Sequence, residues 1–217
     1  MKRIVRLAVI LIALATNAAA QKHSAAEAPP TGKFALMGAT LIYNSDNATG
    51  DAHQEIEGPD IDELRALLRR HSNIRTLQLT SSGGRVWAGN EMARIVLDHA
   101  LDTRVEVECS SSCVTIFLAG DRRQMTKGSR IGFHQTTWST NGLRSYYKNW
   151  REDENWRTPF DFGSWIYQDT QHETAEHLRY MIDRGVDPLF AIETKMARPE
   201  MWFPTRQELE TAGVLRD

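Results

Sequence analysis

The sequence has only two cysteines and no apolar run long enough to cross a membrane. Its longest apolar segment, Leu7 to Thr16, has about ten residues, whereas a transmembrane helix needs roughly 20. Basic residues are not in excess, because 26 Lys and Arg stand against 28 Asp and Glu. The chain therefore lacks the positive surface expected of a nucleic-acid-binding protein. We also expect no membrane span once its N-terminal segment is removed.

Metal-binding patterns are missing as well. Cys109 and Cys113 have no further Cys or His ligands nearby, so they do not form a structural zinc site. The segment His172-Glu173-Thr174-Ala175-Glu176-His177 is similar to a zinc-protease helix, but that motif needs its two histidines four positions apart. Here they are five apart, which separates them by roughly 140° around a helix. We predict a solvated helix face, with no metal and no organic cofactor in the protein.

The N-terminus has the parts of a secretory signal peptide. A cationic start, Met1-Lys2-Arg3, precedes the apolar run, and the small residues Ala18 and Ala20 follow it at the spacing of a cleavage site. An uncleaved anchor helix is the alternative. Because no Cys lies at the cleavage point, we expect no lipoprotein. We predict a signal peptide over residues 1–20, cleavage after Ala20, and a periplasmic or secreted protein.

The chain that remains, about 200 residues, fits one domain with a sizeable core. Residues 21–33 are rich in Ala and Pro and indicate a flexible leader, so the domain is predicted over 34–217.

An exported compartment is oxidising, and four residues of helix rise about 6 Å, inside the usual Cα separation of a disulfide. Cys109 and Cys113 can therefore form a disulfide. The alternative is that both are small buried residues that pack the turn and helix.

Strand and helix patterns alternate through the first half of the domain. Strands are predicted at 34–43, 74–80, 104–108 and 131–134, and helices at 59–70, 88–100 and 112–119. This order predicts an α/β fold with a parallel sheet and crossover helices. An aromatic segment follows at 136–162; it is either an insertion or flap over the site, or plain surface structure with half-buried aromatic residues. Further helices are predicted at 164–184, 188–196 and 205–212.

Three local motifs can carry chemistry. Ser81-Ser82-Gly83-Gly84 follows a strand, and its glycines let backbone N–H groups turn toward a cleft. Cys109-Ser110-Ser111-Ser112-Cys113 opens a buried helix, where free N–H groups can stabilise a developing oxyanion. His134 ends a short strand and can act as the base that a serine hydroxyl needs. Taken singly, they are equally an ordinary turn, helix-capping serines and a structural histidine.

Together and in this order, the motifs resemble the Clp protease proteolytic subunit and its crotonase-fold relatives. The resemblance covers about residues 34–215 and is strong over 77–135. Its first part is a strand with a Gly-Gly turn, here at 77–84. Its second part is a nucleophile turn with a small-residue helix that ends in Ala-Gly, here at 107–120. Its third part is a Ser-Arg-hydrophobic segment that ends in His-Gln, here at 129–135. It implies a crotonase/Clp-protease-like fold, a parallel β-sheet with crossover helices in repeated ββα-type units.

The resemblance also implies roles for particular residues. The family nucleophile lies nine residues before the glycine that closes its helix, which selects Ser111 among the three serines. His134 takes the position of the base. The backbone N–H groups of Gly84 and Ser112 take the positions of the oxyanion donors, where the physical interpretation also places them.

The third catalytic residue is where the sequence departs from the family. The position of the family's acid falls on Met201, which cannot orient an imidazole. The adjacent Glu200 can substitute after a one-residue shift. The alternatives are that Glu200 is a solvent-exposed loop carboxylate and that a backbone carbonyl orients His134 instead.

These features predict a serine hydrolase that transfers an acyl group from a peptide or ester to water. We expect a peptidase for short or unfolded peptides, without the ATP-driven unfoldase of the family's cytosolic members, because ATP is scarce outside the cytosol. Relatives assemble into rings or trimers, so the resemblance implies a homo-oligomer. One alternative is a catalytically inactive crotonase-fold protein that binds peptides or assembles. The other is an esterase or thioesterase that uses the same site.

Overall fold

The computed structural model describes residues 31–217, so the predicted signal peptide and most of the predicted leader lie outside the described residues. Within this range the chain forms strands and helices in the following order: β1 (Phe34–Met37), β2 (Thr40–Asn44), the short 3₁₀ helix η1 (Ser45–Asn47), α1 (Gly58–Arg70), β3 (Thr76–Ser81), α2 (Val86–Asp98), β4 (Asp102–Ser110), α3 (Ser112–Leu118), β5 (Arg123–Met125), β6 (Arg130–Gly132), α4 (Thr140–Trp150), α5 (Pro159–Asp183), α6 (Pro188–Glu193) and α7 (Arg206–Thr211). No helix among these is long and apolar enough to cross a membrane.

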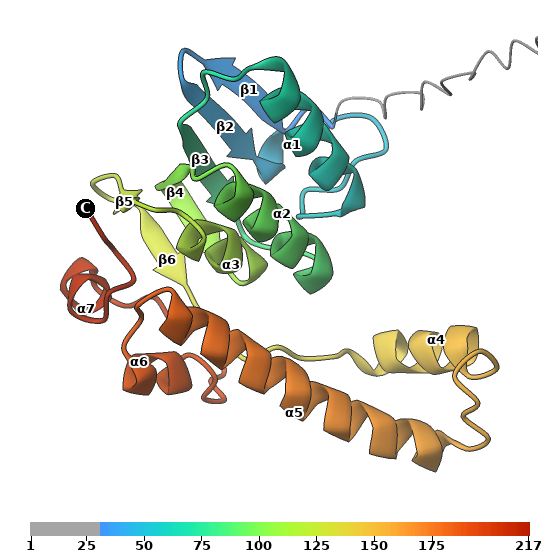
Figure 1. Ribbon diagram of the computed structural model, residues 1–217. Helices are drawn as coiled ribbons and strands as arrows, with labels where there is room; N and C mark the ends of the chain where they lie inside the picture. The colour runs from blue at the N-terminus through green and yellow to red at the C-terminus, as the bar shows by residue number, and fades with distance from the viewer. Residues whose placement is uncertain (1–30) are drawn as a thin grey trace, which may run out of the picture.

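A six-stranded sheet forms the centre of the fold (Figure 1). β1 and β2 are antiparallel, and β2, β3, β4 and β5 then run parallel in that order. β6 also pairs in parallel with β4, further along that strand than β5. β3 is buried along nearly its whole length, as is usual for an inner strand of a parallel sheet. The alternating sequence pattern thus predicted the parallel part of the sheet correctly, and the antiparallel pairing of β1 with β2 was not predicted.

The helices α1, α2 and α3 follow successive strands and lie side by side against the sheet (Figure 1). All seven residues of α3 are buried, which explains why the sequence there is apolar and small rather than amphipathic. The C-terminal part of the chain returns to the sheet through two isolated bridges, Phe133 with Trp202 and Arg123 with Arg216. These bridges place residues near 201 beside the end of β6.

Two details of the sheet differ from the sequence prediction. The segment 34–43 was predicted as one strand, but a turn at Gly38 divides it into β1 and β2. Gly38 has a φ of 61°, in the left-handed region that favours glycine, so that residue was the signal for a hairpin. β5 was not predicted at all, because three residues are too few to show a strand period.

The aromatic segment forms an arm with α4 and the first half of α5, and this arm projects from the body of the molecule (Figure 1). The Tyr146 ring lies 5.8–6.2 Å, between centroids, from the rings of Trp150, Trp156, Phe162 and Trp165. Trp156 and Phe162 are buried in this cluster. Residues 137–162 line neither of the two cavities near the candidate site. Of the two predicted alternatives, the structure has surface structure with half-buried aromatics rather than a flap.

Candidate active site

Ser111 occupies the sharp turn between β4 and α3. Its backbone has φ 56° and ψ −128°, and a positive φ is rare and costly for a residue other than glycine. Two hydrogen bonds hold the turn: the Ser111 N–H donates to the Gly132 carbonyl at 3.0 Å, and the Val114 N–H donates to the Ser111 carbonyl at 3.0 Å. The strained turn lifts the hydroxyl out of the strand and places it directly before the first turn of a helix.

His134 reaches Ser111 because β6 lies beside β4. Ser110 is paired with Gly132 in that ladder, so the chain brings His134 next to the nucleophile turn two residues later. The distance between His134 Nε2 and Ser111 Oγ is 2.7 Å, a short hydrogen bond. The structure thus brings together the predicted nucleophile and the predicted base in the geometry that proton transfer requires.

The backbone N–H groups of Gly84 and Ser112 make no hydrogen bond within the described chain. Ser112 is the first residue of α3, and the first N–H groups of a helix have no partner inside it. Around Gly84, the hydrogen bonds to Ile56 are made by the adjacent residues. The Gly83 carbonyl accepts from the Ile56 N–H, and the Arg85 N–H donates to the Ile56 carbonyl. Both predicted oxyanion donors are therefore free to bind an anionic oxygen.

Glycine is required in this turn by close backbone approach. A Cβ on Gly83 would lie 2.7 Å from Ser111 Cβ, and a Cβ on Gly84 would lie 2.3 Å from the Ile56 nitrogen. Gly84 also has a φ of 155°, which side chains rarely adopt. The two glycines therefore let the segment at Ile56, the Gly-Gly turn and the nucleophile turn pack against one another.

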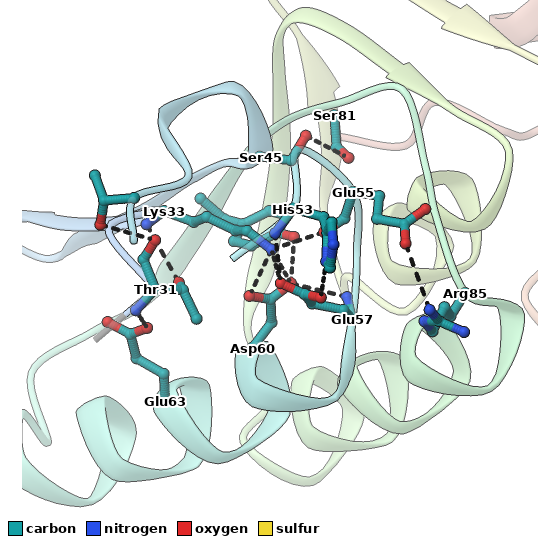
Figure 2. Close-up of polar contacts among 12 residues, drawn as sticks. Thr31, Lys33, Ser45, His53, Glu55, Glu57, Asp60, Glu63, Ser81 and Arg85 are labelled. Carbon is teal, nitrogen blue, oxygen red and sulfur yellow. Dashed lines mark hydrogen bonds and ion pairs between the residues drawn. The ribbon is translucent and has the colours of Figure 1, made fainter. Parts of the chain in front are cut away.

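A buried charge network fixes the segment that carries Ile56 (Figure 2). The Lys33 ammonium is fully buried and bonds Glu57 Oε1 at 3.1 Å, Asp60 Oδ2 at 3.0 Å and the Glu55 carbonyl at 2.7 Å. The Tyr43 hydroxyl donates to Asp60 at 2.8 Å, and His53 Nδ1 lies 3.0 Å from Glu57. The sequence analysis missed this network, because its members are spread over several different segments.

A disulfide links Cys109, near the end of β4, to Cys113 in α3, with Cα atoms 5.3 Å apart. Both residues are fully buried. As predicted, the two cysteines lie on either side of Ser111, and the bond joins the strand that precedes Ser111 to the helix that follows it. Within residues 31–217 no free cysteine remains.

Glu200, the predicted third catalytic residue, makes no hydrogen bond or ion pair with the His134 imidazole in the described part of the chain. Phe133 and Trp202 exchange two backbone hydrogen bonds of 2.8 Å, which makes Met201 the next residue across from His134. Glu200 is exposed, and no hydrogen bond or ion pair in the described part of the chain joins its carboxylate to His134. Ser111 is likewise the only side-chain partner that His134 has among residues 31–217. The role of Glu200 stays a prediction.

Two adjoining cavities lie near Ser111 and His134, and these two residues line only the inner cavity. The inner one, of about 50 Å³, is lined by Ser111, Ser112, His134, His177 and Lys195, among others. The outer one, of about 500 Å³, is lined mainly by residues of α2 and α5. They share Val86, Thr115 and His177 in their walls, so one opens beside the other. Burial lowers the pKa of His177 to about 3, which leaves its imidazole neutral at pH 7.

His177 and Lys195 were missed as site residues by the sequence analysis. His177 was assigned only to a solvated helix face, yet it lines both cavities. The segment that contains His177 was noted only for its similarity to a zinc-protease helix, and no motif marks Lys195. α5 and the segment after α6 come close to Ser111 only through tertiary packing. Within residues 31–217 no group of His, Cys, Asp and Glu could hold a metal ion.

No protein-family model matches the sequence, and no curated protein matches it. Among solved structures, the fold is similar to that of ClpP1 from Listeria monocytogenes and of an asparagine-to-aspartate mutant of that protein. The identities are 15% and 16%, and the TM-scores are 0.52 and 0.50. Each comparison covers 74% of this chain and 84% of the ClpP1 chain. At this identity the likeness shows the fold alone, so the chain has a Clp-protease-like α/β fold.

Proposed function

We propose that this protein is an exported serine hydrolase, most directly a peptidase, with Ser111 as its nucleophile. The observation that carries the proposal is the 2.7 Å contact between Ser111 Oγ and His134 Nε2 beside two unused backbone N–H groups. A serine hydroxyl is weakly nucleophilic until a base takes its proton, and the tetrahedral oxyanion needs donors in place before it forms. The Clp-protease-like fold supports the same conclusion independently.

The proposed reaction has two halves. Ser111 Oγ attacks the carbonyl carbon while His134 accepts its proton, and the N–H groups of Gly84 and Ser112 stabilise the oxyanion. His134 then returns the proton to the leaving nitrogen or oxygen, which leaves an acyl-enzyme. Water attacks this ester with His134 again as base, releasing the acid and restoring the serine hydroxyl.

The substrates are proposed to be short or already unfolded peptides, cleaved without an ATP-driven unfoldase. The outer cavity of about 500 Å³ continues from the nucleophile along α2 and α5, and a groove of this size accommodates a few residues of extended chain. An ester or thioester can use the same machinery. We further propose that the chain is secreted or periplasmic, for which the disulfide gives support, and that it assembles as a homo-oligomer.

A second function is favoured by one observation, namely Met201 across from His134 and the absence of any described partner for the second ring nitrogen. An imidazole that no group orients is a weaker base, because its tautomer and direction are not fixed. A catalytically inactive peptide-binding protein of this fold would have the same cavities without turnover.

Hydrolysis of unfolded protein and of blocked short peptides, measured without ATP, distinguishes the two functions. We expect the wild-type protein to cleave, and Ser111→Ala to lower kcat/KM at least about a thousandfold with an unchanged fold. Ser110→Ala and Ser112→Ala are matched controls and should keep most activity, since only the backbone N–H of Ser112 is used. Equal losses in all three variants, or peptide binding without cleavage by the wild-type protein, would overturn the proposal.

A further inference from the structure

The inner cavity beside Ser111 contains a lysine that no described residue pairs with. Lys195 lies two residues after the end of α6, is half-buried and lines the cavity together with Ser111 and His134. Its ammonium makes no hydrogen bond and no ion pair within residues 31–217. Arg184, by contrast, donates hydrogen bonds to the backbone carbonyls of residues 118–120. A lysine in the wall of a small cavity, with no described partner for its ammonium, can receive an anionic group.

The surroundings of Lys195 distinguish the inner cavity from the outer one. Glu173 is the carboxylate that favours the charged form of Lys195, but it lines only the outer cavity and does not form an ion pair with the lysine. Desolvation by burial lowers the pKa of Lys195, so its charge is poorly solvated and gains from a bound carboxylate. Neutral His177 lies at the junction of the two cavities and can donate one more hydrogen bond.

The inner cavity is also positioned to receive part of a substrate, because Ser111 and His134 form part of its wall. When Ser111 attacks, the acyl-side group and the leaving group on the carbonyl carbon both have to lie next to the nucleophile, and the inner cavity lined by Ser111, Ser112 and His134 has space for one of them. About 50 Å³ admits a short polar side chain rather than a large aromatic one. The walls offer Lys195 together with the apolar Val114 and Phe133.

We propose, building on the hydrolase function above, that Lys195 selects substrates whose acyl-side residue carries a carboxylate, such as peptides cleaved after glutamate or aspartate. The carboxylate binds the Lys195 ammonium and receives a second hydrogen bond from His177. Lys195 is thus a specificity-determining residue, and the reaction itself still depends on Ser111 and His134.

Two peptides test this proposal, blocked at both ends and identical except for Glu or Gln at the acyl-side position. We expect wild-type protein to cleave the Glu peptide at least about tenfold faster in kcat/KM, as a charge-assisted hydrogen bond in a partly buried site implies. Lys195→Gln should remove this preference, and Lys195→Arg should keep part of it. Lys127→Gln removes the same charge at a position outside both cavities and should leave the preference unchanged.

Labelling of Ser111 by a small fluorophosphonate, which has no acyl-side residue, separates this proposal from the hydrolase function. Lys195→Gln should still form the adduct on Ser111, whereas Ser111→Ala should not. Labelling without a Glu preference, or a preference that survives Lys195→Gln, overturns the role of Lys195 alone. A rate gain that comes only from a free C-terminal carboxylate also overturns it, because it places the anion on the leaving side. Absence of labelling in the wild-type protein overturns both.

Discussion

In the proposed mechanism Ser111 is the nucleophile, and the protein holds its backbone in an unusual conformation. Such a sparsely populated backbone conformation costs a serine on the order of 1–3 kcal/mol. The hydrogen bond to Gly132 and the packing of Gly83 maintain it. The sequence selected Ser111 by its spacing to Gly120 alone. The strain could not be predicted, because it arises from β6 and the Gly-Gly turn, which lie far from Ser111 in the sequence.

Met201 lies where an orienting carboxylate would be most useful. We expect Met201→Asp to raise kcat about tenfold or more, because the new carboxylate would lie across from His134 and fix its ring nitrogen proton. Met196→Asp makes the same change at an exposed position and serves as the control. The measurement is kcat for a blocked peptide in both variants.

Glu200 provides the opposite test at the same site. Its exposed carboxylate has no described contact with His134, so Glu200→Gln should leave kcat unchanged. A partial loss of kcat in Glu200→Gln would show that Glu200 orients the imidazole and would make Met201→Asp redundant.

At the scale of elements, the Gly-Gly turn between β3 and α2 depends on its contact with Ile56. Gly84→Ala should lower both activity and melting temperature, because its Cβ meets the Ile56 backbone at 2.3 Å and displaces an oxyanion donor. Gly128→Ala is the matched control, since Gly128 has a φ of 87° but open space around its Cβ. It carries only the backbone cost of about 1–2 kcal/mol. Similar losses of activity in the two variants would show that Gly84 has no special role.

The disulfide between β4 and α3 closes a loop too short to constrain the unfolded chain strongly. Its effect should therefore be local to the nucleophile turn. We expect reduction to lower the rate of hydrolysis more than it lowers the melting temperature, both measured on the same sample. Mass spectrometry of unreduced, alkylated protein is the check, and two alkylated thiols in exported material would contradict the presence of the bond.

The whole molecule should lose stability in acid, in two steps whose pH windows overlap below pH 4.5. Burial lowers the pKa of His177 from 6.5 to about 3, so the unfolded chain binds a proton first and stability falls as the pH drops below about 6.5. Burial raises the pKa of Glu57, but hydrogen bonds from His53 and Lys33 outweigh it and lower the pKa from 4.5 to about 2. The stability that Glu57 contributes is therefore present above pH 4.5 and lost between about 4.5 and 2.

Denaturant unfolding at a series of pH values tests this dependence. His177→Gln should flatten the curve in the upper window, between pH 6.5 and 4.5, and Glu57→Gln should flatten it below 4.5. A curve for either variant that runs parallel to that of the wild-type protein in its window would contradict the assignment.

Much of the whole fold followed from the sequence, because hydrophobic periods and the Gly-Gly turn are local signals. They placed β3, α2, β4 and α3, and with them the nucleophile turn, close to their observed positions. The hairpin of β1 and β2 was missed although Gly38 was its local signal. The apolar residues on both sides of Gly38 led to the prediction of one continuous strand. The projection of the α4 and α5 arm depends on how distant chain segments pack, which no local pattern encodes. The cavity residues His177 and Lys195 were missed for that second reason.

Active-site labelling tests the central claim most directly. A fluorophosphonate probe is incubated with the protein lacking residues 1–20, and the labelled peptide is identified by mass spectrometry. We predict a single adduct on Ser111, absent in Ser111→Ala and formed at least about a hundredfold more slowly in His134→Ala, because the two residues act as a unit. No adduct in the wild-type protein, or an adduct formed at the same rate in His134→Ala, would contradict the assignment of Ser111 and His134 as nucleophile and base.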